Sequence, residues 1–134
     1  MHNYRFTLNI NQYGAVEYNK RNQGKEIDLL DVILLTEIKC LTEWPNIEKR
    51  NIRGKEFAWI AYSKIIDELP LLGITTTDAI GRRLKNLCGF GLMEKETLQT
   101  GKENRKTYFR ITSKGMEIVT LRMGNRNPYG WETV

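Results

Sequence analysis

The sequence is poor in the residues from which metal sites and thiol chemistry are built. Its 134 residues include one histidine, His2, and two cysteines, Cys40 and Cys88, which lie far apart and in no Cys-x-x-Cys pair. A zinc site needs about four Cys, His or carboxylate ligands at close spacing. We therefore expect no metal site and no cofactor, and we interpret both cysteines as buried, reduced thiols.

Long hydrophobic runs are also lacking. The longest apolar cluster, Leu29 to Leu35, is interrupted by Asp31, so no segment approaches the length that crosses a bilayer. The first ten residues, MHNYRFTLNI, do not have the charged and then apolar pattern of a secretory signal. The expectation is a cytoplasmic protein without a membrane partner.

Groupings of residues that could carry catalysis are missing as well. The closest acid pairs each fit a helix cap or a solvent-exposed face: Asp28 with Asp31, and Asp67 with Glu68. There is no Gly-rich loop suited to a phosphate, and no Ser or Cys nucleophile has a histidine in a suitable place. We predict that the protein is not an enzyme.

Positive charge is present in excess, and it is concentrated in one segment. The formal net charge is +5. Residues 1–73 contain ten basic and ten acidic residues, whereas residues 74–112 contain eight basic and four acidic residues. A basic patch on an otherwise neutral body is the footprint expected for a polyanionic partner.

The first part of the chain is predicted to form two helices and a hairpin. Asn11 is a candidate N-cap for a short helix. Asp28 is a candidate N-cap for a longer helix with apolar residues at helical spacing, which ends before Pro45. Residues 47–60 have the pattern of a hairpin whose turn contains Gly54.

A second helical region follows this hairpin. Ser63 is the predicted cap of a short helix that Pro70 ends, and another helix covers about residues 76–88. The predicted caps of that helix are Thr75 or Thr76 at its start and Gly89 at its end. Two strands joined by the polar loop TGKENR and a closing helix complete the prediction.

The predicted helix over residues 76–88 has two chemically different faces. Helical spacing places the apolar residues on one face: Ile80, Leu84, Leu87 and Cys88. The opposite face is polar and basic, with Arg82 and Lys85 near its centre and Asn86 at its edge. Arg83 lies nearer the boundary between the faces, where a phosphate or an acidic neighbour could bind it.

The predicted order of elements from residue 55 is strand, helix, turn, helix, strand, loop, strand and helix. This is the order of a winged helix-turn-helix. We therefore predict an α+β fold, mainly α, with a two-stranded wing and an extra N-terminal helix. Residues 1–122 form the predicted domain, and residues 123–134 form a C-terminal tail in which the roles of Tyr129 and Trp131 stay open.

The predicted partner is double-stranded DNA. In this motif the second helix enters the major groove, and the wing contacts the adjacent backbone or minor groove. Gly81 would let the helix backbone approach DNA closely, although helix packing also selects glycine. The predicted DNA-binding residues are Thr76, Thr77, Gly81, Arg82, Arg83, Lys85 and Asn86 on the recognition helix, and Lys102, Arg105 and Lys106 on a basic wing over about residues 101–107.

One segment has a more specific resemblance. The stretch FAWIAYSKIIDELPLLGITTTDAIGRRLKNLCGFGLME, followed by KTYFRITSKG, resembles the N-terminal winged-helix domain of replication initiator (replisome organiser) proteins of bacterial phages and related mobile elements. The motifs that carry the resemblance are Trp59 to Ser63, Leu69-Pro70-Leu71, Arg82 to Leu87, Gly91 to Glu94 and Thr107 to Gly115. The resemblance covers about residues 55–116. It implies sequence-specific DNA binding in replication initiation, with replication proteins as partners.

Two alternatives stay open at this point. The same core pattern is similar to that of small winged-helix transcriptional repressors, which would use the same DNA chemistry at a promoter. A winged helix can also act as a protein–protein interaction module, because a fold does not determine a function. A homodimer is compatible with both DNA roles, since helix-turn-helix proteins often bind two half-sites.

Overall fold

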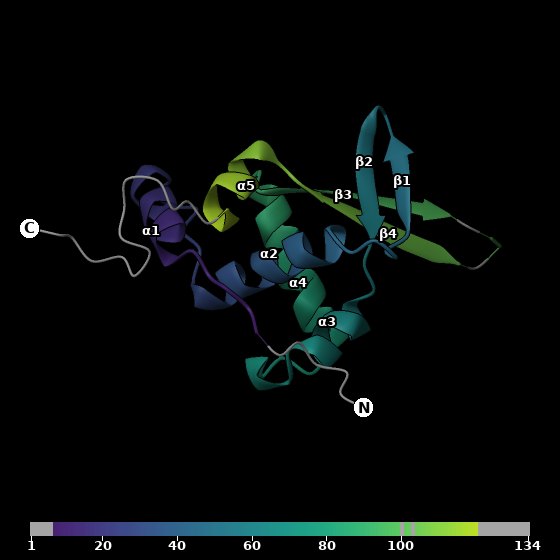
Figure 1. Cartoon of the computed structure of the whole chain (residues 1–134), viewed down its shortest axis with the longest axis horizontal. Helices are drawn as coiled ribbons and strands as arrows, with labels where there is room; N and C mark the ends of the chain where they lie inside the picture. The colour runs from purple at the N-terminus through teal and green to yellow at the C-terminus, as the bar shows by residue number, and fades with distance from the viewer. Residues whose placement is uncertain (1–6, 100, 103, 121–134) are drawn as a thin grey trace, which may run out of the picture.

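The computed structural model describes residues 7–99, 101–102 and 104–120. Within these residues, five α-helices and a four-stranded antiparallel sheet form an α+β fold in which helices predominate. The helices gather on one side of the molecule and the strands on the other (Figure 1). The predicted tail, residues 123–134, lies outside the described residues.

Two capped helices open the described chain. Helix α1 spans Gln12–Arg21, and the side chain of Asn11 accepts a backbone hydrogen bond at its start. Helix α2 spans Leu29–Thr42, and Asp28 and Asp31 exchange side chain–backbone hydrogen bonds in a capping box. Both predicted N-caps, Asn11 and Asp28, are therefore confirmed.

The predicted first hairpin is confirmed. Strands β1 (Lys49–Ile52) and β2 (Lys55–Trp59) pair in antiparallel register. The two residues that join them, Arg53 and Gly54, both have positive φ, at 52° and 80°. Such two-residue turns match the right-handed twist of paired strands, so the turn sets the register of the hairpin.

Two helices joined by a tight turn follow. Helix α3 spans Tyr62–Glu68, a 3-10 turn spans Pro70–Leu72, and helix α4 spans Thr77–Gly89. The predicted Ser63 cap is wrong, because α3 begins at Tyr62 after Ala61, which makes no side-chain capping bond.

The two ends of α4 are held by short-range hydrogen bonds. At its start the Thr76 hydroxyl accepts from the Ala79 backbone at 3.2 Å, so Thr76 rather than Thr75 is the cap. At its end Gly89 is still helical, and the left-handed residue is Gly91, with φ at 82°. The N–H groups of residues 91 and 92 bond back to carbonyls of the last turn in a Schellman pattern. The predicted Gly89 cap is therefore wrong by two residues.

A second hairpin completes the sheet. Strands β3 (Met93–Gln99) and β4 (Arg105–Ile111) pair along their whole length, and the sheet order is β1-β2-β4-β3. Strand β2 pairs with β4 at two positions, so the two hairpins diverge from a short common seam (Figure 1). Helix α5 (Ser113–Val119) follows β4 and lies beside α1 and α2.

The hydrophobic core lies between the helices and one face of the sheet. The predicted inward residues of α4 are confirmed, because Ile80, Leu84 and Leu87 are fully buried, whereas Cys88 is partly buried. They join buried residues of the neighbouring elements, including Leu34, Leu35, Ile38, Ile65, Phe109 and Ile118. In the part of the chain that the structure describes, no helix has the length and apolar character to cross a membrane.

Candidate nucleic-acid interface

The outward face of α4 carries a polar stripe. Arg82, Lys85 and Asn86 are exposed, and their spacing of three and four residues keeps them on one side of the helix. None of these three side chains has a hydrogen bond or ion pair with a described residue. Their polar groups are therefore open to a partner.

The first turn of α4 presents small polar side chains. Thr76 and Thr77 are both exposed there, with Asp78 beside them. The first backbone N–H groups of a helix have no intrahelical acceptor. The Thr76 oxygen accepts one of these hydrogen bonds as the cap. The predicted threonines thus lie at the end of the polar stripe.

Arg83 has acidic partners within the protein. Its Nη1 lies 3.0 Å from an oxygen of Asp28 and 3.0 Å from an oxygen of Asp31, the capping pair of α2. Burial raises the pKa of the Asp28 carboxyl, but hydrogen bonds from Asp31 and Arg83 outweigh this effect and leave that pKa lowered. Burial also raises the pKa of Asp31. Of the two roles predicted for Arg83, the acidic neighbour is the one that the structure contains.

Gly81 faces the neighbouring helix. A Cβ atom at this position would lie 3.2 Å from Cε2 of Tyr62 on α3, which is tighter than most contacts of real Cβ atoms. Close packing of α4 on α3 therefore accounts for this glycine. Gly81 lies one turn before Lys85 on the helix, and the contact that the structure gives it is with Tyr62.

The face of the β3–β4 hairpin on the helix side is basic. The register pairs Lys95 with Phe109, Thr97 with Thr107, and Gln99 with Arg105. Paired side chains share a face and alternate along each strand, and Phe109 belongs to the core. Lys95 and Arg105 therefore lie on the same side of the sheet as α4, and neither has an ion pair with a described residue.

Lys95 is a residue that the predicted site did not include. Burial raises the pKa of the Cys88 thiol on α4; the positive charge of Lys95 opposes this rise and the negative charge of Glu94 adds to it. The side of the sheet on which Lys95 lies is given by its pairing with Phe109. Strand alternation could have indicated it, since Lys95 follows the core residue Met93 by two positions.

The opposite face of this hairpin holds Lys106. Its Nζ lies 2.9 Å from Oε1 of Glu48 and 4.4 Å from the centre of the Trp59 ring. The three predicted wing residues therefore separate in space. Arg105 lies on the helix side, Lys106 lies on the other side with internal partners, and Lys102 is exposed in the connecting loop.

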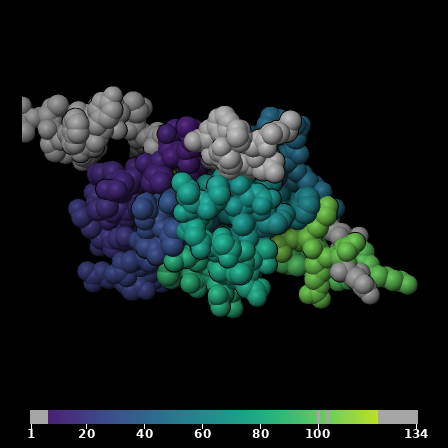
Figure 2. Space-filling view, turned by 90° about the horizontal axis from the view of Figure 1, so that it is seen from below, coloured from purple at the N-terminus to yellow at the C-terminus, as the bar shows by residue number. Residues whose placement is uncertain are grey.

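These placements define one surface, which we call the helix-side basic surface. It comprises Arg82 and Lys85 on α4, and Lys95 and Arg105 on the hairpin that begins just after α4 and projects away from the helices (Figure 1). In Figure 2, α3 and α4 occupy the middle of the visible face, and the light green β3–β4 hairpin projects from its edge. An exposed helix and a protruding hairpin can each contact the same extended ligand.

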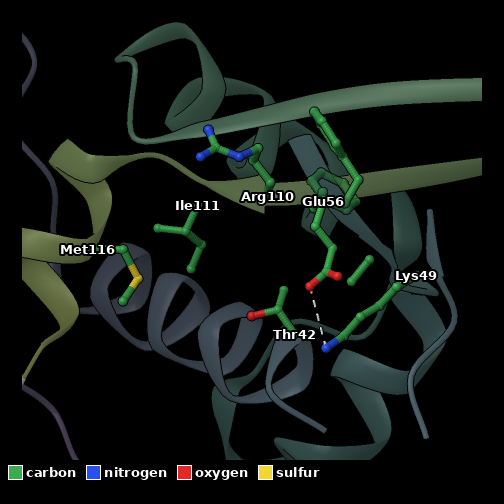
Figure 3. Close-up of a pocket in the computed structure, with 9 residues that line it drawn as sticks. Thr42, Lys49, Glu56, Arg110, Ile111 and Met116 are labelled. Carbon is green, nitrogen blue, oxygen red and sulfur yellow. Dashed lines mark ion pairs between the residues drawn. The ribbon is translucent and has the colours of Figure 1, made fainter. Parts of the chain in front are cut away.

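A pocket of about 220 Å³ lies elsewhere, between the end of α2, the first hairpin, β4 and α5 (Figure 3). Ile111 and Met116 lie on one side of it, and an ion pair of 3.6 Å joins Lys49 and Glu56 on the other. None of the predicted DNA-binding residues lines this pocket. It is smaller than the ~300–1,000 Å³ of common small-molecule sites, and we do not assign it a ligand.

Within the described residues, no group of three His, Cys, Asp or Glu side chains is arranged to hold a metal ion. Cys40 and Cys88 are partly buried and form no disulfide. No protein-family model, curated protein or solved structure gave a match to this chain. The functional argument therefore depends on the chain's own residues.

Proposed function

We propose that this chain is a winged-helix protein that binds double-stranded DNA, with α4 as the recognition helix and the β3–β4 hairpin as the wing. The order of elements supports this proposal. Strand β2, helix α3, the Pro70–Leu72 turn, helix α4 and the second hairpin follow one another, and β2 pairs with β4. This is the order of elements in a winged helix-turn-helix, in which the second helix enters the major groove.

The observation that carries the proposal is the separation of paired and unpaired cations. On the helix-side basic surface Arg82, Lys85, Lys95 and Arg105 have no acidic partner among the described residues. Duplex DNA carries one negative charge per ~1.7 Å of helix axis, so a row of unpaired cations is attracted to it and releases condensed counterions.

The side chains of this surface divide into two chemical types. Arginine can bond the O6 and N7 atoms of guanine, and asparagine can bond adenine, so we assign base contacts to Arg82 and Asn86. Lysines and wing residues bind phosphates without sequence preference, which is the role we assign to Lys85, Lys95 and Arg105. Thr76, Thr77 and Lys102 are candidates for additional phosphate contacts at the two ends of the surface.

The biological role that we propose is replication initiation in a phage or mobile element, which depends on the sequence resemblance. A transcriptional repressor would use the same surface on a different site. Mapping the bound sequences separates the two, because an initiator binds repeats at a replication origin and a repressor binds an operator at a promoter.

The proposal is tested by fluorescence anisotropy with a random duplex over a range of salt concentrations. We expect a dissociation constant near ~10⁻⁴ to 10⁻⁶ M that weakens steeply as salt rises. A double variant, Arg82→Ala with Lys85→Ala, should lose most of this affinity. The matched control, Arg21→Ala with Lys25→Ala, removes two exposed cations at the α1 end and should bind as the wild type does. Absence of wild-type binding even at low salt would refute the proposal.

A further inference from the structure

The face of the β3–β4 hairpin away from the helices has a different electrostatic character, and we call it the outer face. The register places Glu94 opposite Arg110, Glu96 opposite Tyr108, and Leu98 opposite Lys106. The first hairpin reaches over this face, because Arg53 and Lys55 bind glutamates of β3.

Each of four cations on the outer face has a glutamate partner, so three glutamates offset most of its positive charge. Arg53 forms an ion pair with Glu96. Glu94 accepts from Lys55 at 3.4 Å and from Arg110 at 2.5 Å. On the same face Glu48 accepts hydrogen bonds from Lys106 and from the Tyr108 hydroxyl.

Glu94 lies between two cations, and these contacts favour its charged form. Burial raises the pKa of Glu94, but hydrogen bonds from Arg110 and Lys55 outweigh this effect and leave that pKa lowered from its ordinary value of 4.5. The side chains of Glu94 and Glu96 are 35% and 27% exposed, so they are close enough to solvent for their charge to act on an approaching ligand.

The helix-side face of the same hairpin has no such compensation from the residues that the structure describes. Its residues on β3 and β4 beyond the core are Lys95, Thr97, Gln99, Arg105 and Thr107, and none of them is acidic. The hairpin therefore presents unpaired cations on one face and neutralised cations on the other. Without the glutamates, Arg53, Lys55 and Arg110 would form a second basic surface.

We propose that Glu94 and Glu96 determine which face of the hairpin binds DNA, by neutralising the outer face and so confining the polyanion to the helix-side basic surface. This inference rests on the proposed function. Exposed ion pairs add little to stability, but they offset the positive charge that would attract phosphates within a Debye length of ~8–10 Å. The glutamates are specificity-determining residues that do not touch the ligand.

The test compares salt titrations of the wild type and of the double variant Glu94→Gln with Glu96→Gln, using a random duplex. Each added phosphate contact changes the slope of log K against log salt by about −0.9. The variant frees Arg53, Lys55 and Arg110, so three added phosphate contacts would steepen its slope by about 2.7. The control Glu26→Gln with Glu117→Gln changes the net charge equally at exposed sites elsewhere and should leave the slope unchanged.

Two further variants show whether the freed cations are the cause. Adding Arg53→Ala and Lys55→Ala to the double variant should make the salt slope shallower again and so reverse most of the steepening. The same two alanines in the wild type should leave the slope unchanged, since these cations are already neutralised. Circular dichroism of each variant confirms that it is folded.

The outcomes separate the two proposals. A wild type that binds no duplex refutes the proposed function. A wild type that binds, with an unchanged slope in the folded glutamine variant, refutes only the inference about Glu94 and Glu96. A shallower slope after Arg53→Ala and Lys55→Ala in the wild type also refutes the inference, because it would mean that the outer face already contacts DNA.

Discussion

Arg82 and Arg83 are adjacent in the sequence, but replacing each by alanine should affect a different property of the protein. Arg83 binds Asp28 and Asp31 at 3.0 Å each, so it joins α4 to the start of α2. Arg82 is exposed and has no partner among the described residues. We predict that Arg83→Ala lowers the free energy of unfolding, whereas Arg82→Ala lowers the affinity for DNA.

The magnitude for Arg83 follows from its partial burial. Exposed ion pairs contribute about 0–1 kcal/mol, and hydrogen bonds to charged groups contribute about 1.5–3 kcal/mol. The Arg83 side chain is 31% exposed and that of Asp31 is 15% exposed, so the cluster lies between these cases. We expect Arg83→Ala to reduce the free energy of unfolding by about 1–2 kcal/mol. This reduction would lower Tm by roughly 3–8 °C.

Thermal unfolding and salt-dependent anisotropy measure the two effects on the same proteins. Arg82→Ala should change stability by less than about 0.5 kcal/mol and should weaken binding to a selected site by about 1–3 kcal/mol. Arg83→Ala should leave the salt slope unchanged. The reasoning is refuted if Arg83→Ala keeps the wild-type Tm and loses about 0.9 of the slope, because Arg83 would then bind a phosphate.

Three other predictions follow from single features of the structure. Lys95→Ala with Arg105→Ala should make the salt slope shallower by about 2, without loss of base preference. Gly115→Ala should lower the free energy of unfolding by about 3 kcal/mol or more, because the new Cβ atom would lie 2.1 Å from a backbone oxygen. Gly89 is a helical position with open space around it, so Gly89→Ala should raise the free energy of unfolding by about 0.5–1 kcal/mol. The lowered pKa of Glu94 predicts that its contribution to stability is present above pH 4.5 and is lost as the pH falls through the folded-state pKa.

Each of these predictions has a direct check. An unchanged slope for the first variant would remove the hairpin from the interface. Equal Tm values for Gly115→Ala and Gly89→Ala would contradict the close packing of Gly115 against the backbone oxygen of Leu92. The free energies of unfolding of the wild type and Glu94→Gln, measured by chemical unfolding across acidic pH, should converge as Glu94 is protonated. A constant difference between them at every pH would contradict the pKa assignment.

Much of the fold could be predicted because its signals are local. Asn11 and Asp28 cap their helices through hydrogen bonds to residues three positions along the chain, so the sequence alone identified them. The hairpin turn at Gly54 and the apolar face of α4 also depend on near neighbours. The predicted cap Ser63 was wrong because α3 begins after Ala61, which makes no side-chain capping bond, so no local capping signal marks this start. The predicted cap Gly89 was wrong because the chain contains a second glycine two positions later, and Gly91 is the one with left-handed backbone.

The candidate site divides in the same way. Helical spacing alone determined that Arg82, Lys85 and Asn86 share an outward face, because periodicity is a property of the local backbone. Arg83 is 55 positions from its partner Asp28 in the sequence, and Lys106 is 58 positions from its partner Glu48. No local pattern specifies such contacts. Strand alternation already places Glu94 and Glu96 on the face opposite Lys95, but their ion pairs with Lys55 and Arg53 form only where the first hairpin reaches over that face. The sequence by itself therefore determined where positive charge is concentrated, and only the tertiary structure decided which cations are neutralised, because charge pairing depends on distances that folding brings about.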